Sequence, residues 1–259
     1  MSIDIIGAGA LGGFLFASLR ENHNIRLLHT NYQIYRGTIT VNGSVIHNTC
    51  CERYDSLLPT LTIYAGYLHL YKPCGNGPVL FLSNGSIFLK MLKNQHCNYC
   101  GSFNYLAARR LISHRKNLCI AVDDVGAKAT ELVIDDYSLT ATLASSRYKT
   151  LYDPLGSSII QKTLRTIAYA LMATDSTGAH GPDLFNRRRT NRNELCDVLS
   201  EIAIVDSHID RFTDIVYEVS NSLPCGFYPS VARPTSASRN EALYLLGLFR
   251  DWISLRSVS

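Results

Sequence analysis

The fold is decided by residues 3–20, Ile3-Asp4-Ile5-Ile6-Gly7-Ala8-Gly9-Ala10-Leu11-Gly12-Gly13-Phe14-Leu15-Phe16-Ala17-Ser18-Leu19-Arg20. A short apolar run, typical of a buried strand, meets three glycines with the spacing G-x-G-x-x-G, and an apolar helical pattern follows. Gly7 would allow a sharp turn, Gly9 the approach of a pyrophosphate, and Gly12 close packing of helix on strand. The stretch therefore predicts a dinucleotide-binding turn at a helix N-terminus, and the alternative is a glycine turn that serves packing alone. The predicted cofactor contacts are Gly7, Ala8, Gly9, Ala10, Leu11 and Gly12.

Composition indicates a folded globular protein with few of the features of a nucleic-acid binder. The chain has 259 residues, 46% of them hydrophobic, and a formal net charge of +4. Its one basic cluster is Arg187-Arg188-Arg189 with Arg192, whereas nucleic-acid surfaces combine broader basic patches with exposed aromatic residues. We expect this cluster to be a solvated helix start or an anionic-ligand contact, and we expect no nucleic-acid partner.

The chain lacks the usual signs of export or membrane insertion. Its first apolar run has turn glycines and no basic region before it, and no later run offers about 18 uninterrupted apolar residues. We therefore expect a cytoplasmic protein with no membrane partner, whose eight cysteines are free thiols. The pair Cys97-x-x-Cys100 beside His96 is the one arrangement suited to metal or redox chemistry, but it has no second pair at zinc-site spacing, so ordinary thiols and no metal are expected.

The second strand, Ile25-Arg26-Leu27-Leu28, bears on the choice of cofactor. NAD-binding units usually end this strand with a carboxylate for the ribose hydroxyls, whereas NADP sites offer polar or basic groups. Here the strand ends in His29-Thr30-Asn31, with Arg36 further on. The sequence therefore favours NADP over NAD, with Thr30 as a cofactor contact.

Further strands and a hairpin follow before the pattern changes. Residues 37–46 alternate around Asn42-Gly43 and predict a β-hairpin. Buried strands are predicted at 61–64 and 78–82, joined by a connection that is short for a parallel crossover, and further strands at 118–122 and 131–134. Asn84 follows the strand at 78–82, at the end where open α/β sheets bind ligands, although Asn84-Gly85 is also an ordinary turn.

After about residue 150 the apolar spacing becomes helical, over 157–173, 193–205, 209–219 and 241–252. The predicted fold is α/β, with an N-terminal Rossmann-type parallel sheet domain followed by an all-helical C-terminal domain. The predicted domains are residues 1–151 for dinucleotide binding and 152–259 for substrate and dimerisation, with the boundary near Tyr152-Asp153-Pro154.

Four motifs in this order resemble the ketopantoate reductase (2-dehydropantoate 2-reductase) family along nearly the whole chain. They are the glycine motif at 7–12, Asn84-Gly85, Ala107-Ala108-Arg109-Arg110, and Arg239-Asn240-Glu241-Ala242-Leu243-Tyr244-Leu245-Leu246-Gly247. The resemblance implies an NADP-dependent enzyme that reduces a small 2-oxo acid to a 2-hydroxy acid, and family members often dimerise through the helical domain.

The family's catalytic lysine and its two following asparagines are replaced. Aligning residues 164–174 with that segment puts Thr166 at the lysine position, and Ala170 and Thr174 at the asparagine positions. Lys162 lies one helical turn before Thr166 and on the same face, so it is the candidate proton donor if the helix is shifted. The alternative is a solvated lysine at a helix start.

Other family roles carry over to single residues. Glu241 matches the family's substrate-binding glutamate, although a carboxylate at a helix N-terminus also favours the helix dipole. Ser230 matches its substrate-binding serine with a one-residue deletion, whereas Ser222 would need an insertion, and Lys72 corresponds to its cofactor-contacting lysine. The predicted catalytic residues are Lys162 and Glu241, and the predicted substrate contacts are Ser230 and Glu241.

Three functions remain open on the sequence alone. The first is an active NADP-dependent reductase that uses Lys162 or another group as the acid. The second is a catalytically impaired or repurposed relative that binds NADP(H) as a regulatory or interaction module. The third is a structural relative whose glycine turn survives for packing.

Overall fold

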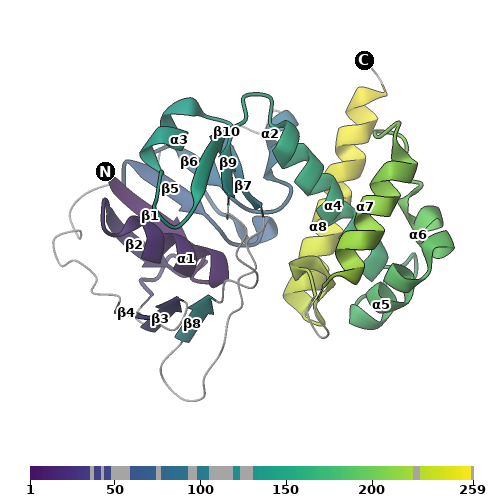
Figure 1. The fold of residues 1–259 in the computed structure, drawn as a ribbon, viewed down its shortest axis with the longest axis horizontal. Helices are drawn as coiled ribbons and strands as arrows, with labels where there is room; N and C mark the ends of the chain where they lie inside the picture. Colours follow the sequence, from purple (N-terminus) through teal and green to yellow (C-terminus); the bar gives the residue numbers. More distant parts are fainter. Residues whose placement is uncertain are drawn as a thin grey trace. The chain divides into compact units, whose positions relative to one another are not determined.

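A computed structural model describes residues 1–35, 38–41, 44–47, 59–73, 77–92, 98–104, 119–122, 131–223 and 228–257. The chain divides into an α/β unit, Met1–Ser86 with Asn94–Ile159, and a helical unit, Ile87–Lys93 with Ile160–Ser259. The predicted fold class, a Rossmann-type sheet followed by helices, is confirmed (Figure 1). The domain ranges 1–151 and 152–259 stay a prediction. No helix within the described ranges is long and apolar enough to cross a membrane.

The main sheet of the α/β unit has seven strands in the order β10-β9-β7-β6-β5-β1-β2. All neighbours pair in parallel except β7 and β9, so the sheet is mixed rather than wholly parallel. The chain passes from β1 to β2 on one side and later returns as β5 on the other, which makes β1/β5 the switch point of the sheet. The strands are β1 Ser2–Ile6, β2 Asn24–Leu28, β5 Leu61–Tyr64, β6 Val79–Phe81, β7 Tyr99–Asn104, β9 Glu131–Ile134 and β10 Lys149–Tyr152.

The central strands of the main sheet are apolar and buried. Ile3, Ile5 and Leu27 have no exposed surface, as expected for buried parallel strands. The exception is Asp4, which lies opposite Arg26 and accepts two hydrogen bonds of 2.8 Å from its guanidinium. This two-point pairing satisfies a carboxylate that would otherwise be costly to bury.

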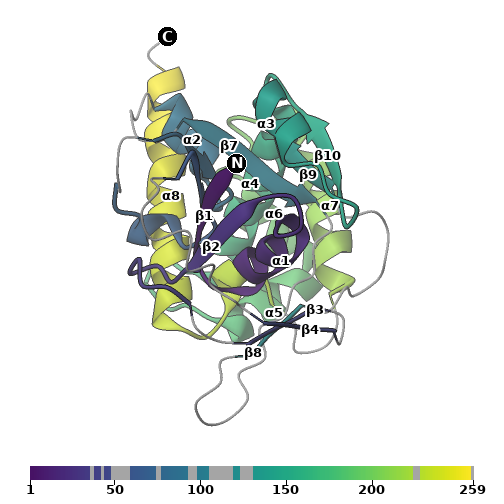
Figure 2. The ribbon, with the colours of Figure 1, turned by 90° about the vertical axis from the view of Figure 1, so that its left-hand side faces the viewer.

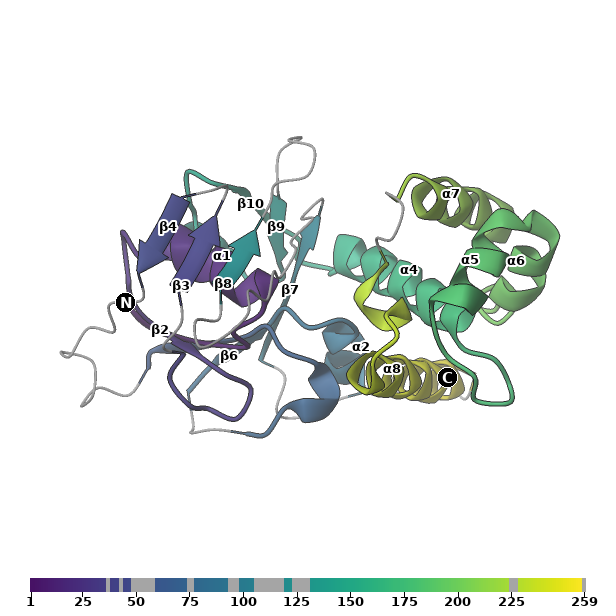
Figure 3. The same cartoon turned by 90° about the horizontal axis from the view of Figure 1, so that it is seen from below.

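Helix α1, Ala10–Leu19, lies between two sheets. It contacts β1 and β2 of the main sheet, and also β3 (Thr38–Val41) and β8 (Cys119–Val122) of a three-stranded sheet with the order β4-β3-β8 (Figure 3). This explains why the helix is apolar all round rather than amphipathic. The predicted hairpin is confirmed as the antiparallel pair of β3 and β4, Ser44–His47, while its turn residues lie outside the described residues.

Two features of the main sheet differ from simple expectation. The short connection from β5 to β6 contains a 3-10 helix, Leu68–Leu70, and the two strands still pair in parallel. Strand β7 was not predicted, because Gly101 interrupts its apolar pattern. A Cβ at Gly101 would lie 2.7 Å from Leu82 Cδ2 and 3.0 Å from Val133 O of β9, so a side chain here would have to displace its neighbours.

The helical unit contains α4 Ser157–Ala173, α5 Pro182–Thr190, α6 Arg192–Leu199, α7 Ile209–Asn221 and α8 Ser236–Arg256. The predicted helix 157–173 is confirmed, whereas the one predicted at 193–205 ends at Leu199. Helix α8 begins before the predicted start because Thr235 caps it, accepting a 3.1 Å hydrogen bond from Ser238 N. Helix α2, Ser86–Met91, lies beside α8 (Figure 2). Between them the rings of Phe88 and Trp252 stack, with their centroids 4.7 Å apart.

The basic cluster serves the helical unit itself. Arg187, Arg188 and Arg189 lie in the last turn of α5, so the expected helix start is wrong for these three, whereas Arg192 does begin a helix, α6. Arg188 bonds to Glu194 and donates to the carbonyl oxygens of Leu171 (2.5 Å) and Thr174 (3.0 Å) at the C-terminal end of α4. Cations favour helix C-termini, and here one cation also satisfies carbonyls that the helix cannot pair. The other contacts are Arg187 to Glu194, Arg189 to Ser220 O, and Arg192 to Asp214.

We expect Arg188→Met to lower the free energy of unfolding by about 2–4 kcal/mol, because it leaves buried carbonyls without a donor. Arg187→Met is the matched control, since Arg187 also pairs with Glu194 but its side chain is 64% exposed, against 11% for Arg188. The control should change stability by less than about 1 kcal/mol. Urea denaturation of the three proteins measures both values, and equal losses would contradict the assigned role of Arg188.

Candidate active site

The glycine motif forms the predicted turn between β1 and α1. Gly7 has a left-handed φ of +111°, and its N–H donates a 2.8 Å hydrogen bond to Leu28 O. A Cβ at Gly7 would lie 2.8 Å from Gly66 N, and a Cβ at Gly12 would lie 2.1 Å from Gly7 O. The predicted conformational roles of Gly7 in the turn and of Gly12 in close packing are therefore confirmed.

Gly9 differs from these two glycines because, beyond its chain neighbours and its own helix, no atom lies within 4 Å of where its Cβ would be. It is the N-cap of α1, with no side-chain cap, and the first turn of the helix carries no acidic residue. Ala10 and Leu11 are half-buried, whereas Ala8 is buried. The N–H groups of the first helical turn have no intrahelical acceptor, so the open space at Gly9 fits an anion such as a diphosphate.

Residues that follow three other strands gather at the same edge of the sheet. Thr30, just after β2, lies so close to Gly66, just after β5, that a Cβ at Gly66 would be 2.9 Å from Thr30 Cγ2. Ser83, just after β6, donates a 2.7 Å hydrogen bond to Gly66 O. Asn84 follows, half-buried, and Gly85 takes a φ of +80°, so the Asn-Gly turn is present at this edge.

Lys72 is exposed, and its backbone is hydrogen-bonded to the turn that follows β2. Its carbonyl oxygen accepts a hydrogen bond from the Tyr32 hydroxyl, and Tyr32 itself has a left-handed φ of +66°. The structure thus brings Thr30, Lys72, Asn84 and the glycine turn to one edge of the α/β unit. Arg36, the basic residue expected to matter for NADP, lies outside the described residues, as does the motif 107–110.

The stripe on α4 that carries the replaced family residues faces the interior of the helical unit. Thr166 is 8% exposed, and its hydroxyl donates to the backbone carbonyl of Lys162 at 3.1 Å. Ala170 has no exposed surface, and the Thr174 hydroxyl bonds to His180 Nδ1 at 3.0 Å. The side chains of Thr166 and Thr174 are therefore engaged within the unit itself.

Lys162 is half-buried one turn before Thr166. Burial, and then the neighbouring Arg165 guanidinium, lower the pKa of Lys162 from 10.5 to about 8. An ammonium group with a pKa near neutrality is suited to proton donation, and such perturbed groups concentrate at functional sites.

The two predicted substrate contacts lie on adjoining elements of the helical unit. Ser230 begins a 3-10 helix, Ser230–Ala232, which packs against α8. Glu241 is 4% exposed and lies in the second turn of α8, since the helix begins at Ser236. The interpretation of Glu241 as a first-turn dipole carboxylate is therefore wrong, because dipole effects fall off within the first turn.

Sequence reasoning missed His180, whose Nδ1 bonds to the Thr174 hydroxyl, and assigned no separate role to Arg239 of the C-terminal motif. The Asp175 carboxylate accepts hydrogen bonds from Thr177 and Ala179 and so shapes the turn that leads to His180. Burial lowers the pKa of His180, and the Arg239 guanidinium lowers it further. The sequence does predict a turn here, from Asp175-Ser176-Thr177-Gly178, but turn residues do not indicate which side chains the turn will contact.

Of the cysteine motif, the structure describes Cys100 alone. Cys100 is fully buried in β7, while Cys97 and His96 lie outside the described residues. The expected free thiols are confirmed for Cys100 and Cys196. In the part of the chain that the structure describes, no three His, Cys, Asp or Glu residues are grouped to hold a metal ion.

No protein-family model matches the sequence, and no curated protein matches it either. Solved structures do. A probable 2-dehydropantoate 2-reductase from Bacillus subtilis superposes with a TM-score of 0.61 at 16% identity, covering 99% of this chain and 94% of that one. A dimeric ketopantoate reductase from Staphylococcus aureus superposes with a TM-score of 0.55 at 14% identity, covering 97% of this chain and 100% of that one.

D-mandelate dehydrogenase, solved in complex with NADH, gives a TM-score of 0.56 at 15% identity, covering 98% of this chain and 99% of that one. Identities this low establish a common fold and leave the activity to be argued from the site. The chain therefore has, over nearly its whole length, the fold of the 2-dehydropantoate 2-reductases, as its sequence motifs led us to expect.

Proposed function

We propose that this protein is an NADP-dependent oxidoreductase that reduces a small 2-oxo acid to a 2-hydroxy acid. The observation that carries the proposal is the open space at Gly9 above the uncapped N-terminus of α1, at the β1/β5 switch point of the sheet. Anions and dinucleotides favour such a position. The absence of a carboxylate in residues 29–35, after β2, favours NADP over NAD.

Different residues of this chain are proposed to bind the cofactor, bind the substrate and donate the proton. NADPH, when bound, would supply the hydride. The first-turn N–H groups of α1 hold the diphosphate, and Thr30, Lys72 and Asn84 are the proposed further contacts. Ser230 and Glu241 bind the substrate, while Lys162, protonated below about pH 8, gives a proton to the carbonyl oxygen as negative charge develops there.

The proposal extends to assembly and location by analogy with the solved structures. One of them is described as a dimeric ketopantoate reductase, and we propose that this chain also forms a homodimer. Its small-molecule chemistry suits a cytoplasmic enzyme.

A second candidate is an NADP(H)-binding regulatory or interaction module without catalysis. The engaged hydroxyls of Thr166 and Thr174 and the buried Ala170 favour it, because the stripe that serves the substrate in the family is turned to packing in this chain.

A thermal-shift titration with NADPH, NADH and ADP, followed by a panel of 2-oxo acids, separates these functions. At 100 times its dissociation constant NADPH should add about 2.7 kcal/mol of stability, and one or more 2-oxo acids should be reduced with loss of NADPH absorbance. A selective NADPH shift without turnover would support the binding module. No shift with any nucleotide would overturn both and leave the glycine turn as a packing device.

A further inference from the structure

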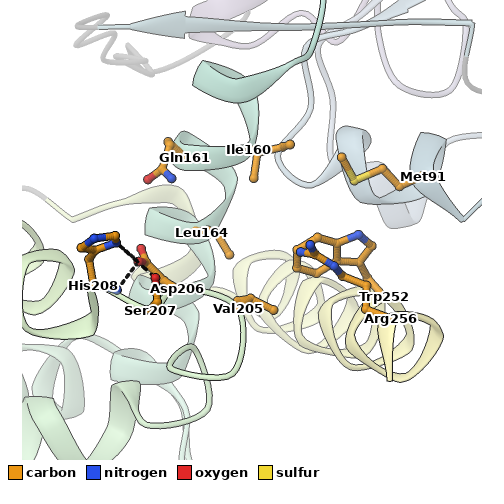
Figure 4. Close-up of a pocket in the computed structure, with 10 residues that line it drawn as sticks. All are labelled: Met91, Ile160, Gln161, Leu164, Val205, Asp206, Ser207, His208, Trp252 and Arg256. Atoms are coloured by element: carbon orange, nitrogen blue, oxygen red, sulfur yellow. Dashed lines mark hydrogen bonds and ion pairs between the residues drawn. The ribbon is translucent and has the colours of Figure 1, made fainter. Parts of the chain in front are cut away.

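The helical unit contains a pocket of about 500 Å³ to which no role has been assigned above (Figure 4). Its size lies within the range of about 300–1,000 Å³ that is usual for small-molecule sites. It lies apart from the residues proposed to hold cofactor or substrate, none of which lines it. The lining residues are Met91, Ile160, Gln161, Leu164, Val205, Asp206, Ser207, His208, Trp252 and Arg256.

The pocket and the proposed proton donor use different faces of α4. Ile160 and Leu164 line the pocket, whereas Lys162 and Thr166 do not. A shift of two residues turns about 200° around a helix, so the two pairs lie on nearly opposite faces. A ligand in the pocket would therefore contact a different face of α4 from the one that carries Lys162.

The middle of the pocket is apolar and comes from three different parts of the unit. Leu164 from α4 and Val205 from the segment between α6 and α7 lie between its two ends, with Met91 from α2 across from them (Figure 4). Leu164 is 3% exposed and Val205 is half-buried. These side chains would hold an aliphatic body by burying its surface.

One end of the pocket carries a positioned cation. The Arg256 guanidinium lies over the Trp252 ring, 4.9 Å from its centroid, and Phe88 stacks on the same indole. Cation–π contact restrains the long arginine side chain beside the pocket, which lowers the entropy lost when it pairs with an anion. A guanidinium also matches the two-oxygen geometry of a carboxylate.

The other end of the pocket carries the carboxylate of Asp206, which would repel an anion placed there. Asp206 Oδ1 accepts a 2.9 Å hydrogen bond from the backbone N–H of His208, and the Ser207 hydroxyl lies 3.3 Å from His208 Nδ1. Asp206 is thus held within its own turn, and its negative charge directs an anionic group away from it. The charges of the pocket therefore orient a ligand with its anion at Arg256.

We propose that this pocket binds a small organic carboxylate with an aliphatic body, with the carboxylate paired to Arg256 and the body against Leu164 and Val205. The site is distinct from that of the proposed 2-oxo acid substrate.

The tryptophan makes this proposal directly testable, because Trp252 is the single tryptophan of the chain and lines the pocket. The probe is omega-bromohexanoate, whose bromine quenches indole fluorescence only on contact. We expect saturable quenching that hexanoate competes away and that acetate and hexylammonium do not. The titration needs neither NADPH nor turnover, so its outcome is independent of the proposed reductase activity.

Two variants and a matched control locate the binding. Arg256→Gln should weaken the affinity for the probe about tenfold or more, since it removes a charge-assisted hydrogen bond. Arg250→Gln is the control, because Arg250 is exposed on the same helix and pairs with Glu201 at 3.6 Å outside the pocket. Val205→Phe should abolish the quenching by filling the apolar middle.

Several results would overturn the proposal. They are an absence of saturable quenching, equal affinity in Arg256→Gln and the unchanged protein, competition by hexylammonium as strong as by hexanoate, and quenching that persists in Val205→Phe. Affinity, not amplitude, is compared, because Arg256→Gln also removes the cation from the indole.

Discussion

Gly12→Ala is expected to destabilise the α/β unit by about 3 kcal/mol or more, whereas Gly9→Ala should leave stability nearly unchanged and impair nucleotide binding. A methyl group at Gly12 would meet the carbonyl oxygen of Gly7 at 2.1 Å. Neither atom belongs to a flexible side chain, so relief requires α1 to move away from β1, and α1 is buried between two sheets. Urea denaturation measures the loss.

Gly9→Ala is the matched control, since it adds the same methyl group at a position where the methyl meets no packed neighbour. Beyond the chain neighbours and the backbone of α1 itself, no atom lies within 4 Å of the new methyl, and the φ of −99° suits alanine. We expect a stability change of less than about 1 kcal/mol, as for ordinary changes at a helix N-cap. The methyl group would occupy the space proposed for the diphosphate, so the NADPH-induced thermal shift should fall sharply. An unchanged shift would remove Gly9 from the cofactor site.

The contrast between Gly12 and Gly9 also marks what the sequence predicts well. The spacing G-x-G-x-x-G encodes a local turn, so the positions of the strand, the turn and the helix follow from neighbouring residues alone. Strand β7 escaped prediction because Gly101 packs against Leu82 and the strand β9 beside it, which are distant in sequence. The start of α8 at Ser236 was missed for a different reason, since its cap, Thr235, is a local signal that the apolar pattern does not include.

The candidate site divides in the same way. The cofactor edge could be predicted because strand ends and glycine turns are local signals. The roles of polar residues in the helical unit could not, since each such residue can bond to its own helix, to a turn or to another helix. Arg188 binds carbonyl oxygens of α4, Thr174 bonds to His180, and Thr166 bonds back to its own helix. No pattern in the sequence distinguishes these roles from contact with a substrate.

Lys162→Met is expected to lower kcat by about 100-fold to 10,000-fold, the usual contribution of a positioned acid or base. The pKa of Lys162 is about 8, and the proposed step needs the protonated amine. Turnover of the unchanged protein should therefore fall above about pH 8, and the variant should lose this limb of its pH profile. Lys149→Met, at an exposed lysine of β10, is the control and should retain both kcat and the profile.

Although Lys162→Met should lower kcat, it should raise the free energy of unfolding at neutral pH. The folded pKa of Lys162, about 8, lies below the ordinary value of 10.5, so the folded state binds fewer protons than the unfolded state between these values. Stability therefore rises with pH across that window, and below pH 8 the charged lysine costs the folded protein about 1–3 kcal/mol. Lys162→Met should be more stable than the unchanged protein at pH 7, and the difference should shrink toward pH 10.5.

The two measurements together decide whether Lys162 has a catalytic role. A half-buried cation that lowers stability is expected where function requires it, because active sites trade stability for chemistry. A variant that gains stability at pH 7 and loses turnover would agree with Lys162 as the proton donor. A variant that gains stability and keeps its turnover and pH profile would remove Lys162 from the mechanism. The acid would then have to be sought among the other polar residues of the helical unit.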